Sequence, residues 1–282
     1  MIKGKWSPNY IYVSVADLDG NGRAEIYVSS LSAVTVSSLV LEWEGSQFKT
    51  IAKGQSWLFR VIDIPGRGKA LIGQKREPDG GYTGDVHFLT REGNRITQAG
   101  PLKLPRFSNV FNFALAPFSH PQKPHTVMLN PYERLQVYDP HGKEVWRSNE
   151  FFGGSLAFIE DKSGDSREGG LGKPLYIPSP IFLIDVDEDG HQEVVVCQNK
   201  SRTGRITEHL RSFSGGMVHF MTWDEAALST QWTSQKLGGA VVGYRVDDVD
   251  YDGQPELVVA AVTGVGFILA KPRSQVVVYD LK

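Results

Sequence analysis

The sequence is poor in several features that mark whole classes of protein. It has one cysteine, Cys197, among 282 residues, which excludes an intrachain disulfide and a cysteine-based zinc cluster. No apolar run reaches the roughly 20 residues that a membrane-spanning helix needs. Lys and Arg number 30 against 32 Asp and Glu, a formal net charge of −2, and this lack of a basic excess argues against nucleic acid as a partner.

Motifs that carry catalysis are also missing. The chain has no G-x-S-x-G, no H-E-x-x-H and no phosphate-cradling G-x-x-x-x-G-K-[ST]. Two of its seven histidines, His87 and His219, occupy the same place in similar V-H-F segments, which favours an architectural over a catalytic role. The sequence therefore predicts no catalytic residue, and we expect a protein that is not an enzyme.

Helical patterning is almost absent, whereas repeats are present. The pattern D-x-D-x-[DN]-G-x-x-E, followed by three strand-forming residues, occurs at 17–28, 185–196 and 248–259. Two degraded copies, at 61–72 and 113–129, keep the strand–loop–strand arrangement and lose most of the acids. An internal repeat of this size indicates an architecture of similar units side by side.

A predicted hairpin follows each of the first four loops. Period-two alternation around polar turns marks residues 39–51, 86–96, 135–146 and 218–232 as antiparallel pairs. The fifth copy, 275–280, lacks its returning arm, and residues 2–7 resemble that arm. Closure of the chain by its first strand would remove the exposed sheet edges, whereas a linear solenoid would need polar capping repeats.

The fold class predicted is all-β, a five-bladed β-propeller of about four antiparallel strands per blade, closed by the N-terminal strand. We expect a single domain over 1–282. The approximate blades are 7–52, 53–105, 106–148, 149–234 and 235–282 plus 1–6.

The three acidic loops have the spacing of calcium ligands. Ca2+ takes 6–8 oxygens, and alternate acids before a glycine with an acid at position 9 can supply them. A lone motif of this kind could be a solvated acidic turn, but three copies in matching strand contexts favour metal. The predicted ligands, with a backbone carbonyl as the fourth of each set, are Asp17, Asp19, Asn21, Arg23 and Glu25; Asp185, Asp187, Asp189, His191 and Glu193; and Asp248, Asp250, Asp252, Gln254 and Glu256.

An EF-hand is the alternative calcium loop, and it needs a glutamate at position 12 between two helices. Position 12 is Val28, Val196 and Val259, each in a β-branched stretch. An EF-hand is therefore excluded for all three copies. We expect up to three Ca2+ ions, bound most strongly at 185–193 and 248–256, because Asn21 replaces an acid in the first loop.

The motifs at 17–28, 185–196 and 248–259 resemble the FG-GAP repeat, also called the VCBS repeat, of integrin α-chain propellers and many bacterial envelope proteins. The resemblance implies a monomeric propeller domain with structural Ca2+ and a periplasmic or cell-envelope location. It also implies that the chain is the C-terminal portion of a longer protein, since Met1 begins no signal peptide. Seven blades are common in that family, whereas this chain has five repeats.

The leading functional hypothesis is a non-enzymatic calcium-binding module that interacts with a protein or with an anionic glycan. The alternative is a polysaccharide-binding lectin or a polysaccharide-degrading enzyme on the same calcium-stabilised propeller. A cytoplasmic scaffold is a third possibility if Met1 is the native start. Eleven of the predicted ligands are carboxylates, so the rest of the chain is net basic, which suits an anionic partner.

Two segments carry further candidates. Residues 161–180 have no counterpart in the other repeats and form either a surface insertion or a partner-binding loop. Residues 198–213 carry Lys200, Arg202, Arg205 and Arg211, which are either solvated or bind an anionic glycan or phosphate.

Overall fold

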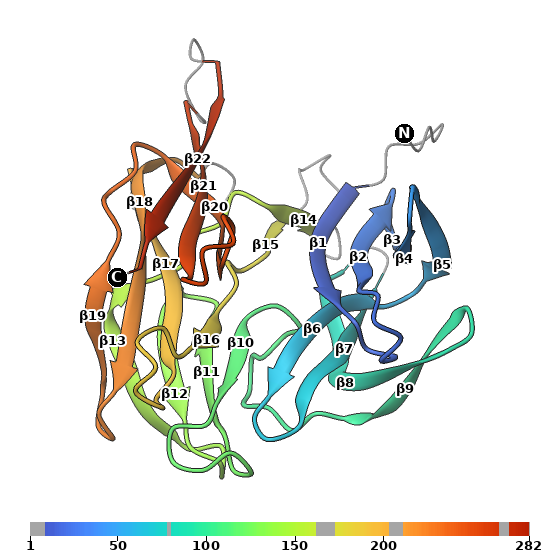
Figure 1. Ribbon diagram of the computed structural model, residues 1–282, viewed down its shortest axis with the longest axis horizontal. Helices are drawn as coiled ribbons and strands as arrows, with labels where there is room; N and C mark the ends of the chain where they lie inside the picture. Colours follow the sequence, from blue (N-terminus) through green and yellow to red (C-terminus); the bar gives the residue numbers. More distant parts are fainter. Residues whose placement is uncertain (1–8, 78–79, 162–172, 203–210, 265–270, 282) are drawn as a thin grey trace. The chain divides into compact units, whose positions relative to one another are not determined.

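The computed structural model describes residues 9–77, 80–161, 173–202, 211–264 and 271–281 (Figure 1). Every regular element in these ranges is a β-strand, and adjacent strands of the five larger sheets pair antiparallel. The all-β prediction is confirmed, and five of the sheets are blades of the β-propeller kind that the repeats predict. The predicted closing strand at 2–7 lies outside the described residues. No helix in the described part of the chain is long and apolar enough to cross a membrane.

The chain divides into two compact units. The first comprises residues 1–110 with 159–175, and the second comprises 111–158 with 176–282. A single domain over 1–282 stays a prediction.

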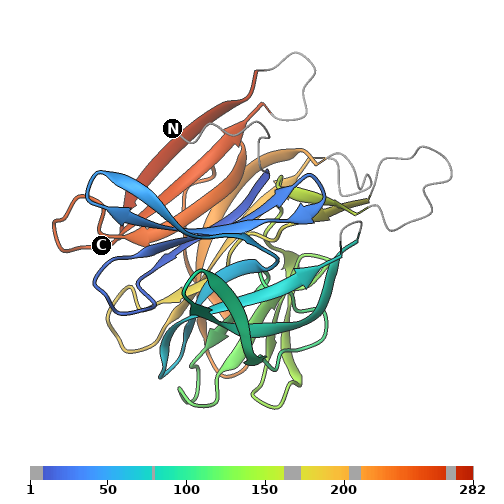
Figure 2. The same ribbon diagram turned by 90° about the vertical axis from the view of Figure 1, so that its right-hand side faces the viewer.

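The first unit contains two of the predicted blades. Figure 2 shows the twist of their strands, which is the usual consequence of L-residue sterics. One sheet has the order β1-β2-β4-β5, with β3 paired to β2, and the other has the order β6-β7-β8-β9. The strands are β1 (Asn9–Ala16), β2 (Glu25–Ser32), β3 (Thr35–Val36), β4 (Ser38–Glu44), β5 (Gln47–Gln55), β6 (Leu58–Ile64), β7 (Gly68–Arg76), β8 (Tyr82–Glu92) and β9 (Arg95–Pro101).

The second unit contains the other three blades, in the orders β10-β11-β12-β13, β16-β17-β18-β19 and β20-β21-β22. One boundary between the units lies at 110/111, and the other two fall within the strands of a short pair, β14 (Phe158–Asp161) and β15 (Lys173–Tyr176). Residues 162–172 of the predicted insertion, between these strands, lie outside the described residues. The strands are β10 (Phe113–Ala116), β11 (His125–Leu129), β12 (Arg134–Tyr138), β13 (Glu144–Phe151), β16 (Phe182–Ile184), β17 (Glu193–Ser201), β18 (Phe213–Trp223), β19 (Leu228–Thr233), β20 (Ala240–Asp247), β21 (Glu256–Thr263) and β22 (Arg273–Asp280).

All four predicted hairpins form. They are β4–β5, β8–β9, β12–β13 and β18–β19, each closed by a short polar turn. The degraded loop copies also join paired strands, β6 to β7 and β10 to β11. Each of these sheets contains one copy of the repeat, because strand pairing is local and each copy carries its own alternation of apolar and polar residues.

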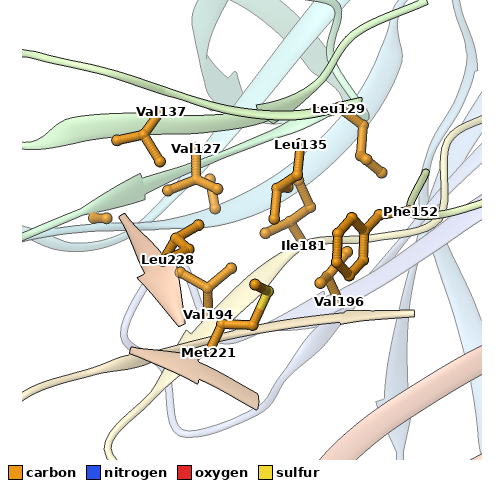
Figure 3. Packing of buried hydrophobic residues seen from close by; sticks show 12 residues of the cluster. Val127, Leu129, Leu135, Val137, Phe152, Ile181, Val194, Val196, Met221 and Leu228 are labelled. Carbon is orange, nitrogen blue, oxygen red and sulfur yellow. The ribbon is translucent and has the colours of Figure 1, made fainter. Parts of the chain in front are cut away.

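The core of the second unit lies between sheets. Figure 3 shows side chains of β11 and β12 pointing toward those of β17 and β18. Val127, Leu135 and Val194 in this cluster are fully buried. Truncating such a side chain costs about 2–5 kcal/mol, so these contacts hold the second unit together.

Trp6, Trp146 and Trp232 occur at the same position of the repeat, which favours packing between blades over stacking on a ligand. The ring of Trp232 lies edge-on to Phe220 at 5.3 Å and to Tyr279 of the next sheet at 6.1 Å. Trp146 packs against the cluster of Figure 3. Trp6 lies outside the described residues.

His219 is a buried part of the architecture. Its ring lies 5.4 Å from that of Phe152, and its Nδ1 is 3.2 Å from the hydroxyl of Thr233. Burial lowers the pKa of His219, while the nearby charge of Glu150 raises it and that of Lys200 lowers it. Burial likewise lowers the pKa of His125. Both imidazoles are therefore favoured as neutral rings in the folded protein.

We expect acid to destabilise the fold through these two rings. Because the folded pKa values lie below the unfolded value of 6.5, the unfolded chain binds more protons as pH falls through 6.5, and stability declines from there downward. The His219→Gln substitution should flatten the dependence of the urea midpoint on pH between about 7.5 and 5.5. The His125→Gln substitution should flatten it further in the double variant. An unchanged slope in both variants would show that neither ring contributes.

Candidate functional site

The three acidic loops lie where the repeats predict, each between the first two strands of a sheet. They connect β1 to β2, β16 to β17 and β20 to β21. A glycine at position 6 has positive φ in each loop, namely Gly22, Gly190 and Gly253 at +81°, +87° and +88°. That conformation suits residues without a Cβ, and it turns the chain back into the second strand.

The glutamate at position 9 is buried in every loop and is held in the same way. One carboxylate oxygen accepts the backbone N–H of position 2, from Leu18 to Glu25 at 3.0 Å, from Val186 to Glu193 at 3.0 Å and from Val249 to Glu256 at 2.8 Å. The glutamates are 0%, 5% and 3% exposed. The same position of the motif therefore takes the same place in all three loops, and the role of these glutamates as metal ligands stays a prediction.

In the second and third loops the acids converge. One carboxylate oxygen from each of the three acids lies within 4.8 Å of the others. These sets are Asp185, Asp187 and Glu193 in the second loop, and Asp248, Asp250 and Glu256 in the third.

One oxygen in each of these clusters has no partner. The Oδ2 atoms of Asp185 and Asp248 accept the N–H groups of Gly190 and Gly253 at 3.0 and 3.1 Å. The Oδ1 atoms of the same two aspartates are buried without a hydrogen bond. A buried carboxylate oxygen without a donor is costly unless a cation faces it. The two loops therefore fit a hard divalent cation such as Ca2+.

The electrostatics of the second loop agree with that fit. Burial raises the pKa of Glu193, and the charges of Asp187 and Asp189 raise it further, whereas the hydrogen bond from Val186 lowers it. A bound dication would reverse the penalty of gathering these charges. Asp189 and Asp252 instead cap their turns, accepting the N–H groups of His191 and Gln254 at 2.7 and 2.8 Å.

The first loop is built differently. Its three converging acids are Asp19, Glu25 and Glu42, and Asp17 is not among them. Glu42 comes from β4, is 8% exposed, and accepts a hydrogen bond from the Asn21 amide at 3.1 Å. The sequence argument missed Glu42. The available signal was an acid inside an otherwise apolar, alternating strand.

A surface groove of about 410 Å3 lies elsewhere in the second unit. The end of β13 and the end of β17 form its walls. The residues that line it are Asn149, Glu150, Phe151, Gln198, Asn199, Lys200 and Ser201.

The groove combines one exposed aromatic ring with several polar groups. Phe151 is 44% exposed, and the guanidinium carbon of Arg134 lies 3.8 Å from its ring centroid. Gln198 donates its side-chain N–H to Glu150 Oε2 at 2.8 Å and to the Phe151 carbonyl at 3.0 Å. These bonds fix the carboxylate beside the ring.

Sequence analysis identified only Lys200 of these groove residues, as part of a basic loop. Arg205 of that loop lies outside the described residues. Arg211 forms an ion pair with Glu133, and its guanidinium carbon lies 3.4 Å from the ring centroid of Tyr176. A cation so engaged is less available to an anionic ligand than a solvated one.

Comparison with known proteins gives one structural neighbour to report. No protein-family model matches the chain, so the FG-GAP or VCBS resemblance is not confirmed. No curated protein matches it either. A similar solved structure is a β-fructofuranosidase from Schwanniomyces occidentalis in complex with fructosyl-erythritol, with a TM-score of 0.49 and 10% identity. The match covers 100% of this chain and 62% of that one.

This neighbour corrects the leading functional hypothesis. It is an enzyme named for a carbohydrate substrate, which contradicts the prediction of a non-enzymatic protein-interaction module, and that prediction is withdrawn. The expectation that the chain is not an enzyme gains no support from it. The polysaccharide alternative is carried forward instead.

Proposed function

We propose that this chain binds polysaccharide in the groove between β13 and β17, and that Ca2+ in the loops at 185–193 and 248–256 stabilises the unit that carries the groove. The observation behind the proposal is the juxtaposition of an exposed Phe151 ring with a fixed carboxylate and an ammonium group in one cavity.

The groove chemistry suits a sugar. Ligand sites combine an apolar or aromatic surface with a few placed polar groups. The exposed part of the Phe151 ring offers apolar surface to the C–H groups of a pyranose or furanose. Glu150 and Lys200 offer an acceptor and a donor for hydroxyl groups, and Lys200 offers a charge for an acidic sugar.

Binding is better supported than hydrolysis. Most glycoside hydrolases use two carboxyl groups about 5–9.5 Å apart across the scissile bond. Among the described residues that line the groove, Glu150 is the one carboxylate. An assay for newly released reducing ends, run on each polysaccharide that binds, tests the degrading-enzyme alternative directly.

The proposed calcium has a structural role. Glu193 begins β17 and Gln198 lies five residues further along the same strand. At about 3.3 Å per residue this separates the loop from the groove by roughly 16 Å, too far for the ion to touch the sugar. We also propose a periplasmic or extracellular location. Extracellular modules bind calcium with a Kd of about 10⁻⁴–10⁻³ M, and a Kd measured in that range would support the proposal.

Replacing Phe151 tests the groove. Phe151→Ala should weaken polysaccharide binding at least about tenfold, or about 1.4 kcal/mol, because buried aromatic anchors dominate such interfaces. A glycan array of neutral and acidic polysaccharides identifies the ligand, and titration calorimetry then compares the variant with the wild type.

The matched control is Phe48→Ala. Phe48 is a 53% exposed aromatic on β5 of the first unit, where it contacts Trp43. It should bind as the wild type does. Equal loss in both variants, or no binding by the wild type to any polysaccharide, would refute the groove as a sugar site.

A further inference from the structure

The first acidic loop joins two paired strands as the other two loops do, but its first aspartate has different hydrogen-bond partners. In the second and third loops one oxygen of that aspartate, in Asp185 and Asp248, is buried without a partner. In the first loop both oxygens of Asp17 accept backbone N–H groups. Oδ1 accepts those of Gly20 and Asn21 at 2.8 and 3.2 Å, and Oδ2 accepts that of Gly22 at 2.8 Å. The first loop thus lacks the orphaned oxygen that a cation would satisfy.

A side chain already supplies positive charge to this loop. Arg91, near the end of β8 in the neighbouring sheet of the same unit, forms an ion pair with the carboxylate of Asp19. The same nitrogen, Nη2, lies 3.2 Å from Glu25 Oε1. That oxygen is the one left over after Glu25 Oε2 accepts the Leu18 N–H at 3.0 Å.

The contact is partly sheltered from water. Arg91 is 22% exposed at its side chain and Glu25 is fully buried. Arg23 adds a second, more exposed cation, with its Nη1 at 3.6 Å from Glu42 Oε1. Across the described ranges, no Lys or Arg forms an ion pair with an acid of the loops at 185–193 or 248–256.

We propose that the guanidinium of Arg91 is the resident cation of the first loop and takes the place that Ca2+ has in the other two. A buried carboxylate needs a positive partner, and a tethered guanidinium supplies it without a metal. A Ca2+ ion in the same cluster would have to displace Arg91 or lie beside a like charge. The first loop therefore keeps its conformation without calcium, and the ion pairs of Arg91 connect β8 to the β1–β2 loop.

The proposal gives the two units different responses to calcium. Both loops proposed to bind calcium, at 185–193 and 248–256, belong to the second unit, whereas Asp19, Glu25 and Arg91 belong to the first. This calcium response rests on the proposed function, but the role of Arg91 does not.

Removing the guanidinium tests the proposal. Arg91→Met removes the guanidinium that pairs with Asp19 and Glu25. It leaves a cluster of three acids, Asp19, Glu25 and Glu42, whose oxygens lie within 4.8 Å of one another. We expect equilibrium dialysis with Ca2+ alone to give two ions per wild-type chain and three per Arg91→Met chain. Arg91→Lys keeps a charge and should stay at two. Arg95→Met, on the facing strand of the same hairpin and exposed, is the matched control and should also stay at two.

The number of ions bound by each variant distinguishes the possible outcomes. Three ions in the wild type, or no gain in Arg91→Met, would overturn the proposal. No ion in the wild type but one in Arg91→Met would uphold Arg91 and refute the calcium loops of the second unit. If Arg91→Met fails to fold, Asp187→Asn/Asp250→Asn with Arg91 intact replaces it. It should bind no Ca2+, and one remaining ion would overturn the proposal.

Discussion

Calcium at about 100 times its Kd should raise the thermal midpoint of the second unit by about 10–20 °C, and EDTA should reverse the rise. A ligand at 100 times its Kd stabilises the folded state by about 2.7 kcal/mol per site. In a unit of about 150 residues, each kcal/mol shifts the midpoint by about 2–4 °C. Two loops, at 185–193 and 248–256, contribute. Scanning calorimetry with and without Ca2+ measures the shift.

Substitution in the loops should remove the calcium response. Asp187 and Asp250 are exposed, and each accepts one long backbone hydrogen bond, at 3.4 and 3.1 Å. Replacing both with alanine removes two metal ligands and should change the free energy of unfolding of the metal-free protein little. Asp63→Ala, near the end of β6 beside the degraded loop, is the control and should keep the full response. A calcium-induced rise that survives in the double variant would show that the ion binds elsewhere.

Asn199→Leu should lower the free energy of unfolding by about 3 kcal/mol or more. Asn199 is 3% exposed on β17 and joins two segments that are distant in sequence. Its amide donates to the carbonyls of Gly154 and Val241 at 2.6 and 2.8 Å, and its oxygen accepts the Val241 N–H at 2.8 Å. Leucine would leave three buried backbone groups unpaired, at about 1–3 kcal/mol each.

The packing around Asn199 leaves no room for adjustment. A Cβ placed on Gly216 would lie 2.2 Å from Asn199 Oδ1 and 2.9 Å from Val241 N, so the backbones approach closely at this point. Urea denaturation of the variant measures the loss. Asn149→Leu, an exposed groove residue, should change stability by less than about 0.5 kcal/mol. A loss below about 1 kcal/mol for Asn199→Leu would mean that water replaces the missing partners.

Much of the fold was predictable because it is local. Strand alternation and polar turns placed the hairpins β4–β5, β8–β9, β12–β13 and β18–β19, since a two-stranded pair needs only neighbouring residues. The acidic loops could also be identified from the sequence, because the predicted ligands of each loop lie within nine consecutive residues. The buried glutamates Glu25, Glu193 and Glu256 took the common place that the motif predicts.

Contacts between distant residues could not be predicted in this way. Arg91 reaches Glu25 across 66 positions, and Gln198 reaches Glu150 across 48. Nothing in the spacing of the first loop indicated that a side chain from another sheet supplies its charge. The sequence by itself determined which segments are strands and which loops are rich in oxygen ligands. Only the tertiary structure decided which acids already have a cation and where a groove forms, because both depend on how sheets bring remote side chains together.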